Sequence, residues 1–222
     1  MTRRMSRRFL LTAGLGAVTA GCVDSPVIKN ATQVARNAVV GNPDLPLQRT
    51  TVSKLPYASM TARVGKGPQA LLILGRIDGR EQHWLSTDRA AVVTRGGRVV
   101  RTFGFPENLR ETRLAGEDPV DGRLHALSGP APFTRHLDLD PQRQYGVPID
   151  STFETIGEEK IRIVELDFDV IQVKERNVAR VIGWEFENLY WVDAGDGFVW
   201  RSRQHIARSF PALQYDILKP AG

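Results

Sequence analysis

Tryptophan and arginine side chains are the residues of this sequence best suited to hold a sugar or an acidic polymer. An indole face stacks on a sugar ring, and a guanidinium donates paired hydrogen bonds to carboxylates and phosphates. The candidate binding residues are Trp84, Trp191, Arg201 and Arg203. Trp191 is the best exposed candidate, because strand alternation places it on the face opposite Trp184. The competing interpretation is that the tryptophans fill the core and the arginines pair with acidic residues.

Catalytic chemistry is poorly supported by the sequence. The chain has no Gly-x-Ser-x-Gly elbow, and its four histidines are scattered without the spacing of metal ligands. The carboxylate pairs Asp138/Asp140 and Asp167/Asp169 could serve a glycosidase, because alternate residues of a strand share one face. Alternating polar residues on a solvated strand are the simpler explanation. We therefore predict no catalytic residue and no metal, and keep a polysaccharide-modifying, glycosidase-like enzyme as the alternative.

Cys22 is the only cysteine, so it cannot take part in an internal disulfide. Small residues precede it, and the segment from Thr19 to Cys22 resembles a bacterial lipobox, with Thr19 where an aliphatic residue is usual. In that chemistry the thiol forms a thioether to diacylglycerol, and the new amino terminus takes a further acyl chain such as palmitate. We predict covalent lipid on Cys22 and no other cofactor, with a free thiol as the alternative.

Residues 1–21 have the layout of an export signal that is removed. Four arginines precede an apolar stretch of about thirteen residues, too short to span a bilayer. Arg7 and Arg8 also resemble a twin-arginine motif, so the general and twin-arginine export routes both remain open. Val23 rather than Asp follows the cysteine, which in Gram-negative sorting is typical of the outer membrane. We predict an exported, lipid-anchored protein on the periplasmic face of the outer membrane.

The charge of the chain excludes nucleic acid as a partner. It carries 30 basic and 25 acidic residues, and four of the arginines lie in the removed segment. The remainder is nearly neutral with interleaved signs, and a basic footprint is what nucleic acid requires. Residues 22–49 are predicted to be a lipid-anchored tether with a short helix at about 25–41, where apolar residues recur every three or four positions. Residues 50–222 are predicted to form a single β-rich domain.

From about residue 50 the apolar pattern changes to period two, with tight turns at Asp78-Gly79, Gly96-Gly97 and Asp196-Gly197. Residues 105–150 indicate longer loops around short strands. A change of register within 161–170 indicates a bulge or a strand buried on both faces. Nine to eleven strands in neighbouring hairpins predict an all-β fold: a mainly antiparallel meander closed as a barrel or sandwich, with a short N-terminal helix.

Several segments occur in the same order along the chain as in a known family; among them are GGRVVRTFGFPENL, WEFENLYWVDAGDGFVWRSRQH and the terminal DILKP. They resemble the YjbF/GfcB family of bacterial lipoproteins. That family is linked to group 4 capsule and exopolysaccharide secretion. The resemblance runs from the lipobox to the C-terminus and implies a mainly β fold and an outer-membrane address. It implies no catalytic residue. The positions that match the family's motifs are Tyr57, Trp84, Arg98, Trp191 and Arg201, and the match assigns them no role.

Together these observations predict a non-enzymatic lipoprotein that assists assembly or export of an extracellular or capsular polysaccharide. It would act by binding glycan or a secretion partner. The expected partners are the membrane, through the lipid, the polysaccharide, and an outer-membrane barrel protein of the same secretion system. A structural envelope lipoprotein is a further alternative.

Overall fold

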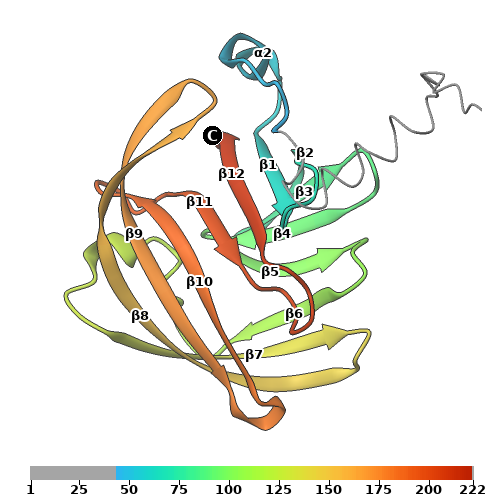
Figure 1. The fold of residues 1–222 in the computed structure, drawn as a ribbon, viewed down its shortest axis with the longest axis vertical. Coiled ribbons are helices and arrows are strands. Elements are labelled where there is room, and N and C mark those ends of the chain that lie inside the picture. Colours follow the sequence, from blue (N-terminus) through green and yellow to red (C-terminus); the bar gives the residue numbers. More distant parts are fainter. Residues whose placement is uncertain (1–43, 222) are drawn as a thin grey trace, which may run out of the picture. The chain divides into compact units, whose positions relative to one another are not determined.

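A computed structural model describes residues 44–221, which form one antiparallel sheet of twelve strands preceded by a short helix (Figure 1). The predicted signal, the predicted tether helix and Cys22 lie outside these residues. The helix is α2 (Arg49–Lys54), and the strands are β1 (Ser59–Val64), β2 (Ala70–Asp78), β3 (Glu81–Ser86), β4 (Ala91–Arg95), β5 (Arg98–Phe103), β6 (Asn108–Leu114), β7 (Ala131–Asp140), β8 (Gln144–Ile163), β9 (Leu166–Ala179), β10 (Trp184–Asp193), β11 (Val199–Gln204) and β12 (Leu213–Lys219).

The strand order makes the sheet a nearly closed barrel. Strands that follow one another in the chain pair antiparallel, β1 also pairs with β12, and the ladder is interrupted only between β5 and β6. Across that seam the backbone N–H of Leu109 donates to Oγ1 of Thr102 at 2.9 Å, so a side chain replaces strand pairing. The predicted all-β meander with a short N-terminal helix is confirmed, and it closes as a barrel rather than a sandwich.

The predicted hairpin turns join β2 to β3, β4 to β5 and β10 to β11. Gly96 and Gly97 have φ values of 57° and 106°, the left-handed region that a two-residue turn of this kind requires. A Cβ added to Gly97 would lie 2.4 Å from Cγ2 of Val199. This turn therefore folds against the inner wall of the barrel and needs glycine for both reasons.

The interpretation of residues 161–170 as one irregular strand is wrong. The chain turns at Val164 and Glu165, whose φ values are 41° and 69°, and this turn separates β8 from β9. Neither residue is glycine, so the usual sequence signal for a hairpin is absent. Residues 105–150 contain β6, β7 and the start of β8, and the long loop between β6 and β7 includes a 3₁₀ turn at Leu124–Ala126.

Two apolar clusters hold these elements together. The larger fills the barrel and includes Leu213, Tyr215 and Ile217 of β12. The smaller contains Leu218, and alternation along β12 therefore places it on the outer face of the sheet. It joins Val52 of α2 to the far end of the β8–β9 hairpin, which reaches past the neighbouring strands in Figure 1. This outer cluster fixes α2, the first element of the described residues.

Candidate functional site

The interior of the barrel contains a buried network of charged groups. Arg98 on β5 forms a two-point ion pair with Asp118 in the β6–β7 loop, and its Nη2 also donates to Oε1 of Glu175 on β9 at 2.8 Å. Nη1 of Arg135 on β7 donates to the same Oε1 at 2.8 Å. Nδ2 of Asn188 donates to the other oxygen, Oε2, at 2.7 Å. Two cations and two anions thus neutralise one another, as buried charges require.

The electrostatics of this network follow from its burial. Burial opposes ionisation of Glu175, but the charges of Arg135 and Arg98 outweigh it and lower the pKa of Glu175 to about 2. Burial lowers the pKa of Arg135, which shares Glu175 with Arg98. The pKa of Arg98 is raised despite its burial, because Asp118 and Glu175 both stabilise its charge. The charged groups of the network form their hydrogen bonds with one another and with neighbouring groups of the protein, so we assign the network a structural role.

Trp84, one of the predicted binding residues, does not lie on the surface. Its side chain is 1% exposed, and its Nε1 donates to Oγ1 of Thr94 at 2.8 Å inside the barrel. It therefore belongs to the core and cannot contact a ligand on the outer face.

Trp191 and Arg201 are brought together as directly opposed residues of β10 and β11. The Cζ of Arg201 lies 5.9 Å from the Trp191 ring centroid. Both side chains are already engaged. Arg201 forms a two-point ion pair with Asp216 at 2.5 and 3.0 Å, and Nε1 of Trp191 donates to Oε1 of Glu159 at 2.5 Å. Arg203 is exposed on the same face, two residues further along β11. Trp191 and Arg201 together therefore attach the β8–β9 hairpin to the sheet.

A polar cleft of about 670 Å³ lies across the seam between β5 and β6, away from the predicted residues. Its walls include Arg101 and Phe103 of β5, Arg110 and Glu111 of β6, and Asp140 at the end of β7. Phe103 is 49% exposed, and so offers its ring to solvent. The two arginines donate hydrogen bonds and the two carboxylates accept them, so the cleft can serve both roles of a sugar hydroxyl.

Tyr145 of β8 flanks this cleft with a second exposed ring. It is 54% exposed, its hydroxyl lies 3.5 Å from Oδ1 of Asp140, and Cζ of Arg110 lies 5.9 Å from its ring centroid. Nη1 of Arg110 lies 3.4 Å from Oδ2 of Asp140. An exposed ring beside a charged pair is an arrangement that stacks on a sugar and hydrogen-bonds its edges. We call Phe103, Arg110, Asp140 and Tyr145 the seam site.

Sequence reasoning missed the seam site because its residues lie on four strands, in the stretch that appeared least regular. The alternation of inward and outward side chains along β5 could have identified Phe103 as outward-facing. Only the closure of the sheet into a barrel, which brings β5 next to β6, places it near Arg110. In the described part of the chain, no helix is long and apolar enough to cross a membrane. Across residues 44–221, no three histidine, aspartate or glutamate side chains are grouped to hold a metal ion.

These features define the class of small antiparallel meander barrels whose interior is filled by side chains. The chain belongs to the YjbF family, described as "Group 4 capsule polysaccharide lipoprotein gfcB, YjbF", whose model matches residues 32–218. The predicted family is thereby confirmed.

Two relatives from Escherichia coli K12 support the same conclusion. The lipoprotein GfcB is 28% identical over 203 residues, covering 91% of this chain and 94% of GfcB. The lipoprotein YjbF is 25% identical over 186 residues, covering 83% and 86% of the two chains. The crystal structure of the lipoprotein YmcC from the same organism superposes with a TM-score of 0.72 at 27% identity, covering 89% of this chain and 97% of that one.

Proposed function

We propose that this protein is an exported lipoprotein, attached through Cys22 to the periplasmic face of the outer membrane, that assists assembly or export of capsule polysaccharide. It acts by binding the glycan rather than by catalysis. Membership of a capsule polysaccharide lipoprotein family supports the association with capsule. An outer-membrane barrel protein of the same secretion system remains its proposed protein partner.

The seam site is the observation that carries the glycan assignment. The seam site combines two exposed aromatic rings, Phe103 and Tyr145, with the ion pair of Arg110 and Asp140. A second pair lies beside it: Nη2 of Arg101, in the wall of the cleft, is 3.2 Å from Oε1 of Glu81. Each pair is partly solvated, so a sugar hydroxyl can reach it without a large desolvation cost.

The direct test is retention of the lipoprotein on immobilised capsule polysaccharide from the same strain. Tyr145→Ala should weaken retention by up to about tenfold, since stacking on one aromatic ring contributes roughly 0.5–1.5 kcal/mol. Tyr57→Ala is the matched control, because Tyr57 is 56% exposed and lies before β1, outside the seam site. Equal retention of both variants would refute the seam site as the glycan-binding surface.

A further inference from the structure

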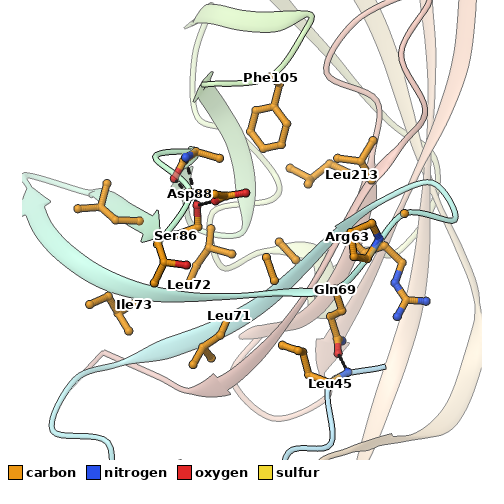
Figure 2. A pocket seen from close by; sticks show the side chains of 18 residues that line it. Leu45, Arg63, Gln69, Leu71, Leu72, Ile73, Ser86, Asp88, Phe105 and Leu213 are labelled. Carbon is orange, nitrogen blue, oxygen red and sulfur yellow. Dashed lines mark hydrogen bonds between the residues drawn. The ribbon is translucent and has the colours of Figure 1, made fainter. Parts of the chain in front are cut away.

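A second and chemically different cavity opens at the end of the barrel where the β1–β2, β3–β4 and β5–β6 turns meet. It has a volume of about 710 Å³ (Figure 2). Leu72 and Ile73 of β2 contribute to it together with Leu85, Phe105 and Leu213. Figure 2 shows the lining side chains, with Phe105 and Leu213 on the opposite side of β2 from Ile73. Mouths of β-barrels are common ligand sites, and this volume falls within their usual range.

Several polar side chains at the rim of this apolar pocket already have partners within the protein. Oγ of Ser86 bonds to Asp88 and also lies 3.0 Å from the carbonyl oxygen of Ala90. Oε1 of Gln69 accepts from the backbone N–H of Leu45 at 2.9 Å, drawn as a dashed line in Figure 2. A peptide or a sugar entering the pocket would bring polar groups that these walls do not satisfy, at a cost in free energy.

A hydrocarbon chain has no such groups to satisfy, and an apolar cavity of this kind does not hold water well. Ile73 and Leu85, opposed residues of β2 and β3, remain 38% and 47% exposed while lining the pocket. Exposed apolar side chains that continue into a cavity indicate a binding surface. The lining therefore favours an aliphatic ligand.

The position of the pocket along the chain identifies the source of that ligand. Leu45 forms part of its wall, and Asp44 is the first described residue. Asp44 lies twenty-two positions after Cys22, a distance of at most about 75 Å when the chain is fully extended. If the protein is anchored as proposed above, the pocket lies within reach of the bilayer that holds the anchor.

We propose that this pocket binds a fatty-acyl chain of a membrane lipid. The proposal rests on the lipid anchorage of the proposed function, and it is independent of the seam site.

The test uses the full lipid-anchored protein in vesicles that contain a photoreactive palmitate probe. After illumination, labelled peptides are mapped by mass spectrometry. Labelling is expected in 70–73 and 85–90. Ile73→Glu should reduce it at least about tenfold, because a bound acyl chain would cover the new carboxylate and remove its water. Ile77→Glu is the matched control: Ile77 is on the same strand and 52% exposed, but it does not line the pocket.

Ala70→Phe provides a second, uncharged variant that fills the pocket and should also reduce labelling. Equal loss in the Ile73 and Ile77 variants, or labelling spread evenly over the barrel, would overturn the proposal. Labelling by a photoreactive geranylgeraniol probe but not by palmitate would overturn the assignment to an acyl chain. Ile73→Glu should retain polysaccharide normally, so failure here is distinguishable from failure of the glycan assignment.

Discussion

Arg98 and Glu175 meet inside the barrel across seventy-seven residues of sequence, with Nη2 of the arginine 2.8 Å from Oε1 of the glutamate. Arg98 lies on β5, at one side of the unpaired seam, whereas Asp118 and Arg135 follow β6 on the other side. Glu175 binds both arginines, and Arg98 also binds Asp118. The buried network therefore holds together the two edges that backbone pairing does not join.

Replacing Glu175 should destabilise the barrel strongly. Glu175→Ala leaves Arg135 buried without a carboxylate partner, and breaking a buried pair in this way costs roughly 3–5 kcal/mol. Glu154→Ala is the control, because its pair with Arg176 is solvated and contributes at most about 1 kcal/mol. Urea unfolding followed by tryptophan fluorescence measures both changes. A Glu175 variant as stable as the Glu154 variant would contradict the structural role of the network.

The carboxylate of Glu175 should also make the free energy of unfolding depend on pH in the acidic range. The pKa of Glu175 is lowered from 4.5 to about 2 in the folded protein, so the folded state binds this proton less readily than the unfolded chain. Its contribution, on the order of 3 kcal/mol, is present above about pH 5 and is lost as the pH falls towards 2. Glu175→Gln should flatten this part of the profile of unfolding free energy against pH. An unchanged slope in that variant would rule out Glu175 as its origin.

Gly97 should be far less tolerant of a side chain than Gly79, although both have positive φ. In Gly97→Ala the new Cβ meets Val199 at 2.4 Å, whereas nothing lies within 4 Å of the corresponding position in Gly79→Ala. We expect a loss of about 1 kcal/mol for Gly79→Ala and at least about 2 kcal/mol more for Gly97→Ala. Thermal denaturation of the two variants measures the difference, and similar melting temperatures would contradict it.

Trp191→Phe should release the β8–β9 hairpin without unfolding the barrel. The substitution keeps a ring but removes the bond from Nε1 to Glu159, which contributes about 1 kcal/mol. Amide hydrogen exchange in residues 158–169 should accelerate, while exchange in β10 stays slow. Unchanged exchange in Trp191→Phe would show that other contacts hold the hairpin.

Cys22→Ser should abolish lipid attachment, because a hydroxyl does not replace the thiol in forming the thioether. Metabolic labelling with radioactive palmitate should mark the natural protein and leave the variant unlabelled. Fractionation should then find the variant outside the membrane fraction. Label that persists on Cys22→Ser would refute attachment at this residue.

The sequence was most informative where local chemistry decides the structure. The Asp78-Gly79 and Gly96-Gly97 turns could be predicted because few other residue pairs accept positive φ at low cost. Alternation from Trp184 to Val192 correctly placed Trp191 on the outer face. The turn at Val164 and Glu165 could not be found in this way, because its strained backbone is supported by long-range contacts, including one from Glu165 to the backbone N–H of Arg49.

The functional surfaces were harder to predict, because they depend on how distant strands meet. Arg98 and Glu175 occupy inward positions of their strands, but each looks like an ordinary surface charge until its partner is placed opposite. Phe103 lines the same cleft as Arg110 and Asp140 only because the sheet curves until β6 returns to β5. Trp84 shows the opposite error: its residue type suggested a ligand contact, whereas its partner Thr94 satisfies its one polar atom within the core.

The pairing of β1 with β12 also has a consequence for the order of assembly. β1 is synthesised before the other strands, yet one of its two edges stays open until β12 has followed. An open edge invites pairing with other chains. The barrel can close only after its last strand has been made, so a chaperone that shields β1 during that interval would protect the protein when it is most prone to aggregate.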